Sequence, residues 1–346
     1  MVATIRDVAK RAKVSVATVS RVVNPSTHPV TPATRRRVLA VVEELAYHPN
    51  VIAQSLKRHA SRTVALIVPD ISNPFFPAIA RGIEDTARQR GYAVLLCNTY
   101  EDLDREQAYL QLLRKRWVDG MIFATVGSNT AHLRALRDDR LPVVLVARDV
   151  DGVPIDAVLV DNERGAYEAT SHLLRLGHRA IAHIAGPASL RVARDRHRGY
   201  ARALREAGVP ENETRVAAGD FTAEGGRAAA AVLLQRGIRF SAVVAANDLM
   251  AIGAMEALRA ASRRIPEDVA VVGFDDITFA SLVSPALSTV AQPKYRMGQL
   301  AMERLLELVA GASPAGRRTV LEPRLIVRES CGAQHHAELS QGGARA

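Results

Sequence analysis

The sequence predicts a small α-helical domain followed by a larger α/β core, and three observations point to this. Positive charge gathers at the start of the chain: residues 1–62 hold eleven Lys and Arg against three Asp and Glu, whereas the remainder holds 35 against 33. The first 49 residues carry apolar positions at helical spacing,. From residue 62 onward, short apolar runs alternate with amphipathic segments, as in β-α-β units with parallel strands,.

Two short helices with a tight joint are predicted over residues 4–24. Thr4 can cap the first helix, with Asp7 complementing its dipole, and Ser15 can cap the second,. Each helix carries one apolar face, and the residues concerned are Ile5, Val8, Ala9 and Ala12, then Val19, Val22 and Val23,. Packing these faces together turns the rest of the second helix outward, which is the helix-turn-helix arrangement.

The outward side chains of the second helix suit double-stranded DNA. Arg21 can bind a guanine edge through two hydrogen bonds, while Val16 and Ala17 can contact thymine methyl groups,. Small hydroxyl residues suited to phosphate oxygens are Ser15, Thr18 and Ser20,. The concentrated charge favours DNA binding over a helical bundle with no nucleic acid partner.

A third helix is predicted after the pair. Thr31 can cap it and Pro32 suits its first turn,. The residues predicted to face inward are Val38, Leu39, Val42 and Leu45. A three-helix domain over residues 1–49 follows from this pattern.

The segment Asn50–Lys57, NVIAQSLK, is predicted to be a hinge helix within a linker over residues 50–61. Asn50 can cap it, but a helix this short is marginal by itself,. We therefore expect it to be frayed without DNA and to fold on the DNA site.

The core is expected to consist of two similar α/β subdomains. The runs TVALIVP, YAVLLCN, DGMIFA, PVVLV and DAVLV predict buried parallel strands of the first, and AIAHIAG, TRVAAGD, SAVVAAN and VAVVGFDD predict a second set,. The cleft between them lies where strand carboxyl ends meet. No nucleotide-binding or hydrolase motif is found at the expected spacing,.

Polar and aromatic side chains follow these strands. The candidate cleft residues are Asn73, Phe75, Phe76, Arg148, Arg196, Phe221, Asn247, Asp275 and Gln292. Aromatic faces pack on C–H groups, and Arg, Asn and Asp bind hydroxyls, so the set suits a sugar or similar polyol. Phe75 or Phe76 as core residues, and Asn247 as a helix cap, are the structural alternatives.

The whole chain, from IRDVAKRAKVSVATVSRVVN through NVIAQSL to VVGFDD, resembles the lactose/galactose/purine repressor family of bacterial transcription regulators. The resemblance implies a homodimer that binds a near-palindromic operator under the control of a small effector. It also implies a periplasmic-binding-protein-like core. In relatives, the residue matching Leu56 wedges into the minor groove and the residue matching Ala53 packs against its dimer mate. The implied DNA-binding set is Thr4, Ser15, Val16, Ala17, Thr18, Ser20, Arg21, Asn24, Asn50, Ala53, Leu56 and Lys57.

The cleft residues named above also match the sugar contacts of pentose-binding periplasmic proteins, so a pentose is one expected effector. Two positions depart from the patterns. Ala147 stands where pentose binders commonly have an aspartate, which removes one carboxylate acceptor. Lys13 stands where the repressor family usually has a glycine in the helix-turn-helix turn. If that turn needs a positive φ, lysine costs about 1 kcal/mol there, and its charge can instead reach a phosphate.

The resulting domain scheme has a core over residues 62–331 and a polar tail over 332–346. Within the core, one subdomain covers about 62–161 and 291–322, and the other about 162–290 and 323–331. The first ten residues lack an apolar core of signal-peptide length, no run approaches a membrane span, and two cysteines fit a reducing cytosol,. We expect a cytoplasmic protein with no cofactor and no metal, His335 and His336 belonging to the tail. A sugar-binding protein without a DNA role and an α/β sugar-active enzyme are the alternatives.

Overall fold

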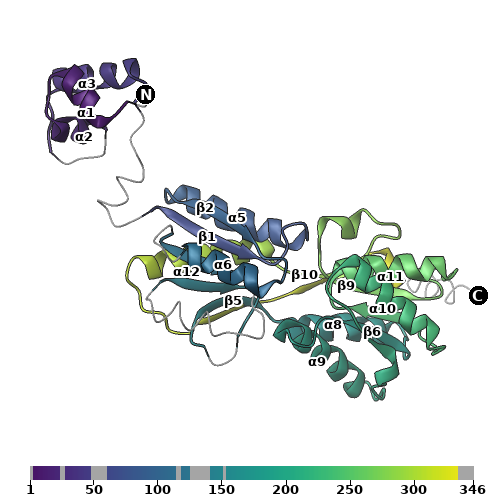
Figure 1. The fold of residues 1–346 in the computed structure, drawn as a ribbon. Helices are drawn as coiled ribbons and strands as arrows, with labels where there is room; N and C mark the ends of the chain where they lie inside the picture. Colours follow the sequence, from purple (N-terminus) through teal and green to yellow (C-terminus); the bar gives the residue numbers. More distant parts are fainter. Residues whose placement is uncertain are drawn as a thin grey trace, which may run out of the picture. The chain divides into compact units, whose positions relative to one another are not determined.

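The structure is a computed structural model that describes residues 3–23, 28–47, 61–113, 118–124, 141–150 and 153–333. The chain divides into two compact units, Met1–Ser61 and Arg62–Ala346. Figure 1 shows the ribbon of both units and labels many of their helices and strands. Within the described residues, none of the helices combines the length and the apolar character needed to cross a bilayer.

The N-terminal unit contains α1 (Ile5–Ala12), α2 (Val16–Val23) and α3 (Pro32–Glu44). Thr4 caps α1 in a capping box: Thr4 accepts from Asp7 N, and the Asp7 carboxylate accepts from Thr4 N at 2.9 Å,. Ser15 Oγ accepts from Thr18 N at 3.1 Å and so caps α2. These predicted caps are confirmed, as is the cap of α3, where Thr31 accepts from Thr34 N.

An apolar core joins these three helices. Its buried side chains are Val8, Ala9, Ala12, Val19, Val22, Val38, Val41 and Tyr47. The prediction that Leu39 faces this core is wrong, because its side chain is 45% exposed and Val41 is buried instead. At 3.6 residues per turn, Val38 and Val41 lie on one face of α3, whereas Leu39 is turned about 100° from Val38.

The described strands of the second unit form two six-stranded sheets. The first sheet has the order β11-β5-β4-β3-β1-β2 with all neighbours parallel. Its strands are β1 (Thr63–Val68), β2 (Ala93–Asn98), β3 (Gly120–Phe123), β4 (Val143–Val146), β5 (Asp156–Val160) and β11 (Arg318–Leu321). The five strands predicted for this subdomain are confirmed.

Strand β2 is not buried as predicted. It forms the edge of the first sheet, and Leu95 and Leu96 are each 43% exposed. Consecutive strand residues point to opposite faces. The apolar run YAVLLCN therefore predicted a strand correctly but its burial wrongly, because Leu95 and Leu96, on opposite faces, both stay exposed at this edge.

The second sheet has the order β12-β10-β9-β8-β6-β7, in which only the β10–β12 pair is antiparallel. Its strands are β6 (Ile181–Ala185), β7 (Val216–Ala218), β8 (Ala242–Ala245), β9 (Ala270–Asp275), β10 (Ser288–Ala291) and β12 (Arg324–Ile326). The four predicted strands of this set are confirmed, and the sequence patterns do not predict β10, β11 or β12.

Helices cover both sheets. They are α5 (Phe75–Gln89), α6 (Leu103–Leu113), α8 (Asn162–Arg175), α9 (Arg191–Glu206), α10 (Ala223–Gln235), α11 (Asp248–Ala260) and α12 (Lys294–Val309), with 3-10 turns η1 (Glu213–Arg215), η2 (Thr278–Ser281) and η3 (Glu329–Cys331). Helices α5 and α12 approach closely because Gly82 and Gly298 face the opposite backbone; an added Cβ would lie 2.2 Å from Tyr295 O and 2.1 Å from Ile79 O. This contact fixes the start of α5, which carries Phe75 and Phe76.

The chain passes between the two sheets in three short crossings. They are the segments 160–162, from β5 to α8, 291–294, from β10 to α12, and 321–324, from β11 to β12. Helix α12 follows a strand of the second sheet but packs on β3, β4 and β5 of the first. Figure 1 shows β10 running between the two subdomains.

Candidate functional site

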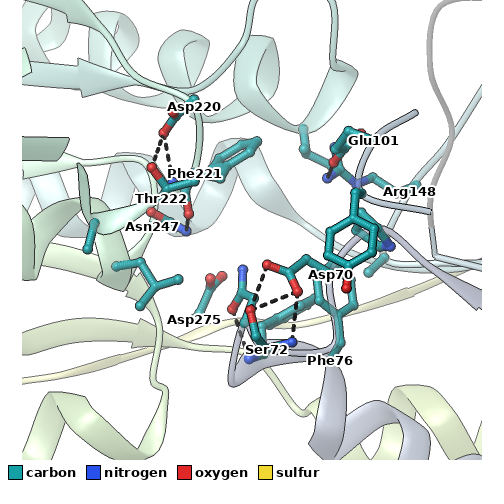
Figure 2. Close-up of a pocket in the computed structure, with 18 of the residues that line it drawn as sticks. Asp70, Ser72, Phe76, Glu101, Arg148, Asp220, Phe221, Thr222, Asn247 and Asp275 are labelled. Atoms are coloured by element: carbon teal, nitrogen blue, oxygen red, sulfur yellow. Dashed lines mark hydrogen bonds and ion pairs between the residues drawn. The ribbon is translucent and has the colours of Figure 1, made fainter. Parts of the chain in front are cut away.

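A cavity of about 450 Å³ lies where the carboxyl ends of strands from both sheets meet,. The segments that follow β1, β2, β4, β7 and β8 line it, together with the last residue of β9. Figure 2 shows Asn247 and Asp275 across the opening from Arg148. Eight of the nine predicted effector residues line the cavity: Asn73, Phe75, Phe76, Arg148, Arg196, Phe221, Asn247 and Asp275.

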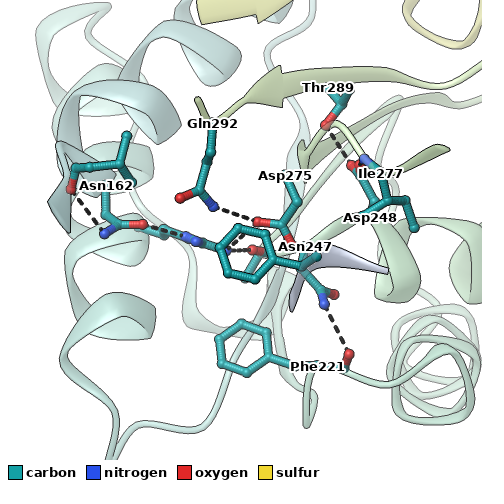
Figure 3. A network of polar contacts seen from close by, with 12 residues as sticks. Asn162, Phe221, Asn247, Asp248, Asp275, Ile277, Thr289 and Gln292 are labelled. Carbon is teal, nitrogen blue, oxygen red and sulfur yellow. Dashed lines mark hydrogen bonds and ion pairs between the residues drawn. The ribbon is translucent and has the colours of Figure 1, made fainter. Parts of the chain in front are cut away.

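The ninth residue, Gln292, stands behind the cavity wall. Its Nε2 donates a 2.7 Å hydrogen bond to Asp275 Oδ1 (Figure 3). Because Gln292 is itself buried, this bond fixes how the carboxylate is presented to the cavity. The structure therefore gives Gln292 a positioning contact, and ligand binding by the whole set stays a prediction.

The aromatic side chains form two separate platforms. Phe75 and Phe76 pack edge to face with ring centroids 5.1 Å apart, and both are buried at the cavity wall. They start α5, where Phe75 N donates to Asn73 Oδ1 at 3.0 Å. Both structural roles, core packing and cavity lining, thus apply to the same pair of rings.

Phe221 forms the second platform, from the other sheet. Its φ of 69° places it in the left-handed region, and the absence of a side chain at Gly186 leaves room for its ring, since a Cβ there would lie 2.4 Å from it. The guanidinium carbons of Arg148 and Arg196 lie 5.7 and 5.9 Å from the ring centroid. Two cations therefore lie within reach of cation–π attraction to this ring.

Arg196 is buried and its nitrogens are largely occupied. Nε donates to Asn162 Oδ1 at 2.8 Å, Nη1 donates to the carbonyl of Ala246, and Nη1 lies 3.6 Å from Asp275 Oδ1. Burial lowers the pKa of Arg196 to about 10, so it stays charged at neutral pH. Burial also raises the pKa of the Asp275 carboxyl, opposed first by Arg196.

Arg148 differs in how its nitrogens are used. Nη2 pairs with Glu101 Oε1 at 3.2 Å, whereas the buried Nη1 donates to no atom of the residues that the structure describes. Burial lowers the pKa of Arg148, and the nearby Glu101 and Asp275 oppose that shift. A buried donor without an acceptor is costly unless a ligand or water satisfies it.

Asn247 serves in two ways at once. Its Oδ1 accepts from Met250 N at 2.9 Å and caps α11, and its Nδ2 donates to Phe221 O at 2.9 Å. Figure 3 shows this contact beside the Asp248 carboxylate, which accepts from Ile277 N and from the Thr289 hydroxyl. The capping alternative for Asn247 and its place at the cavity wall are both observed.

Ala147, which stands where pentose binders commonly have an aspartate, adopts the left-handed backbone conformation. Its φ is 60°, and its N–H donates to Val158 O at 2.9 Å. It contributes only a methyl group to the wall next to Arg148. No carboxylate is available from this position.

Several wall residues were not predicted, among them Asp70, Ser72, Tyr100, Glu101, Asp220 and Thr222. Ser72 Oγ donates to the Asp70 carboxylate and Thr222 Oγ1 to Asp220 Oδ1, each at 2.7 Å. Each of these residues follows closely after a strand, which is the signal that could have identified them.

The helix-turn-helix residues are placed as predicted where the structure describes them. Val16, Ala17 and Arg21 are exposed on α2. The hydroxyls of Ser15 and Thr18 bond each other at 2.9 Å, and Ser20 is half-buried. Thr4 is engaged in its capping box. The remaining predicted DNA contacts, Asn24, Asn50, Ala53, Leu56 and Lys57, and the hinge helix lie outside the described residues.

Lys13 adopts the left-handed conformation that its position requires, with φ 51° and ψ 48°. Its backbone N–H closes the end of α1 by donating to Ala9 O and Lys10 O. The side chain is exposed at the joint between α1 and α2. The condition named for this residue, a positive φ, is thus met, and the contact of its charge with a phosphate stays a prediction.

The site offers hydrogen-bonding and aromatic groups for recognition. Across the described residues there is no cluster of three His, Cys, Asp or Glu side chains that could hold a metal ion. His335 and His336 fall beyond the last described residue, 333.

Both units match known family models. Residues 4–50 match the family described as bacterial regulatory proteins, lacI family. Residues 61–329 match the family described as periplasmic binding proteins and sugar binding domain of LacI family.

Individual relatives cover nearly the whole chain. The HTH-type transcriptional regulator DegA of Bacillus subtilis (strain 168) is 39% identical over 333 residues, covering 95% of this chain and 98% of its own. The ribose operon repressor of Halalkalibacterium halodurans is 38% identical over 336 residues, covering 97% and 99%. Among solved structures, a lac repressor dimer bound to operator and the anti-inducer ONPF has TM-score 0.86 at 30% identity, covering 96% and 99%. A complex of the transcriptional regulator CelR with cellobiose has TM-score 0.74 at 36% identity, covering 95% and 99%.

Proposed function

The chain belongs to the LacI family of bacterial regulatory proteins, and from that membership we propose how its described parts carry out regulation. It is a DNA-binding transcriptional regulator rather than an enzyme, and its relatives are named regulators and repressors. A small effector in the cavity controls operator affinity, and the protein works as a repressor. A DNA-binding role places it in the cytoplasm.

The N-terminal unit reads the operator through α2. Its exposed residues Val16, Ala17 and Arg21 enter the major groove, where Arg21 binds a guanine edge. The surrounding cationic excess at residues 1–62 supplies phosphate contacts and makes binding salt-dependent,. Replacing Arg21 by Ala should weaken operator binding by about 1–3 kcal/mol and relax sequence preference.

The segment Asn50–Lys57 couples the two units by folding on the operator, with Leu56 as a minor-groove wedge. This part of the proposal rests on the sequence, because the segment lies outside the described residues. A Leu56→Ala variant should bind operator much more weakly and keep its effector affinity. Unchanged operator affinity in a gel-shift titration contradicts the hinge mechanism.

The effector is a sugar or similar polyol, and the residues that line the cavity support this proposal. Aromatic faces from both subdomains meet there with four carboxylates, two guanidinium groups and two side-chain amides. The name of the Halalkalibacterium relative refers to ribose, but Ala147 supplies no carboxylate here, so ribose itself is not the preferred effector.

A homodimer agrees with the symmetry of the operator and with the exposed edge of the first sheet. A two-fold symmetric protein matches a near-palindromic site. Strand β2 leaves a sheet edge open, with Leu95 and Leu96 exposed and Leu103 and Leu112 of α6 exposed nearby in sequence. An exposed apolar edge strand can pair with another chain, and a second copy of this chain covers the β2 edge.

The decisive experiment measures operator binding and sugar binding on the same protein. Full-length protein is titrated onto labelled operator duplex with and without each sugar that shifts its melting temperature. We expect at least one neutral sugar to change operator affinity, with the reciprocal change in sugar affinity on DNA. Salt-dependent DNA binding without any sugar response contradicts effector control by a polyol. Sugar binding without DNA binding favours the alternative of a sugar-binding protein.

A further inference from the structure

We propose that the cavity contains two sugar subsites and that the effector is a disaccharide. An inner subsite lies among the buried wall residues, an outer subsite is formed at the mouth by Tyr100 and Glu101, and Arg148 lies between the two. The inference rests on the proposed function, since it specifies the effector of the same cavity.

The volume of the cavity exceeds the needs of one sugar ring. At the packing density of protein interiors, about 0.75, a hexose of about twelve heavy atoms fills on the order of 200 Å³. The cavity measures about 450 Å³. Two linked rings fill it, whereas a single ring leaves roughly half of it to water.

The inner subsite is the more enclosed part of the wall. Phe75, Asn247 and Asp275 are each buried to more than nine-tenths. Phe221 and Arg196 complete it with an aromatic face and a charge. A first ring finds here a platform, a carboxylate acceptor and nearby donors, which is all that one monosaccharide requires.

The outer subsite begins with an exposed aromatic ring. Tyr100 lines the cavity yet is 63% exposed. The guanidinium carbon of Arg105 lies 5.0 Å from the ring centroid, so one face of the ring is covered. The uncovered side of the ring remains available to pack on the C–H face of a second sugar ring.

Arg148 connects the two subsites. Its guanidinium lies 5.7 Å from the Phe221 ring of the inner subsite, and its Nη2 lies 3.2 Å from Glu101 Oε1 of the outer one. Its Nη1 is buried and has no acceptor among the described residues. An oxygen at the junction of two rings, such as a glycosidic or adjacent hydroxyl oxygen, satisfies that donor.

The backbone of the outer subsite is held in an uncommon conformation. Tyr100 and Glu101 both adopt positive φ, 56° and 58°. Tyr100 N donates to Pro69 O at 2.6 Å and Asp102 N donates to Thr99 O at 3.0 Å, so the turn is fixed on both sides. Consecutive left-handed residues with side chains are costly and concentrate at binding sites, which supports a recognition role for this turn.

The test compares single sugars with their dimers. Full-length protein is titrated calorimetrically with glucose, cellobiose and maltose, with galactose and lactose, and with xylose and xylobiose. We expect one disaccharide to bind at least tenfold more tightly than its constituent monosaccharide. Tyr100→Ala should weaken that disaccharide about tenfold and leave the monosaccharide unchanged, while Tyr100→Phe retains the ring and the affinity.

A matched control is Tyr167→Ala. Tyr167 is a tyrosine of α8 outside the cavity wall, and Arg202 lies 4.4 Å from its ring centroid in the same type of contact. It should change neither affinity. A monosaccharide that binds as tightly as every disaccharide, or a Tyr100→Ala loss that is equal for both, overturns the two-subsite inference and leaves effector control intact. Failure of the proposed function looks different: no sugar of the panel alters operator binding by the wild-type protein.

Discussion

Gln292 donates a 2.7 Å hydrogen bond to Asp275, so the carboxylate at the end of β9 is oriented by a residue in the crossing that follows β10. Removing the amide in Gln292→Ala leaves the cavity lining unchanged but frees the carboxylate. We expect effector affinity to fall about tenfold, the loss of one hydrogen bond to a charged group. Asp275→Asn should cost more, because it removes the charge that faces Arg196. Calorimetric titration measures both, and equal affinity of wild type and Gln292→Ala contradicts a positioning role.

Lys13 combines backbone strain with a charge at the helix-turn-helix joint. Lys13→Gly should raise the unfolding free energy of the N-terminal unit by up to about 1 kcal/mol, because glycine adopts the left-handed conformation without penalty. If the Lys13 ammonium contacts a phosphate, Lys13→Gly should also lower operator affinity. The slope of log affinity against log salt should then decrease in magnitude by about one. Lys13→Asn, which tolerates the same φ without the charge, should reproduce the affinity loss. A Lys13→Asn variant with unaltered salt slope argues that Lys13 makes no phosphate contact.

His183 makes the stability of the core dependent on pH. It is fully buried on β6, its Nδ1 lies 2.8 Å from Val244 O, and burial lowers its pKa to about 3 from 6.5. Below pH 6.5 the unfolded chain binds a proton that the folded chain does not. The unfolding free energy should therefore fall as pH decreases from 6.5 toward 3, by up to about 1.4 kcal/mol per pH unit.

Urea denaturation at pH 7.5 and 5.0 checks this, with His183→Gln as the informative variant. It should show a smaller loss of stability between the two pH values than the wild type. His172→Gln is the comparison, because burial lowers the pKa of His172 as well. An identical pH dependence in wild type and His183→Gln excludes His183 as the cause.

The open edge of β2 gives a prediction about assembly. Leu96→Glu places a charge on the proposed dimer surface and should shift the protein toward monomer in sedimentation velocity at micromolar concentration. Val232→Glu, at an exposed apolar residue of α10, is the control and should leave the sedimentation coefficient unchanged. A Leu96→Glu variant that sediments as the wild type does would place the interface elsewhere.

Local patterns predicted much of the fold because their causes are local. Hydroxyl caps such as Thr4 and Ser15 satisfy helix N–H groups within three residues, so the sequence contains the whole interaction,. Likewise, apolar runs of four to six residues predicted nine strands. Strands covered on both faces need no alternation of apolar and polar residues. The position of the cleft was also predictable from local sequence, because its polar and aromatic residues come directly after predicted strands.

Features that depend on distant parts of the chain were not accessible in this way. The exposure of Leu95 and Leu96 follows from the position of β2 at the sheet edge, which its own residues do not specify. Strands β11 and β12 are short and exist through pairing with β5 and β10. The place of Tyr100 at the cavity depends on the loop after β1, to which its N–H is bonded. Local sequence patterns do not predict such contacts between distant segments.

The three crossings between the sheets lie side by side, because β5 pairs with β11 and β10 pairs with β12. Each is only a few residues long and so reaches at most about 3.5 Å per residue. Short adjacent connections restrict translation, so we expect the two subdomains to move mainly by rotation about the line of crossings. Asn162 and Gln292 stand on two of the crossings and contact Arg196 and Asp275. We therefore expect effectors of different chemistry to act through the same relative rotation of the two subdomains.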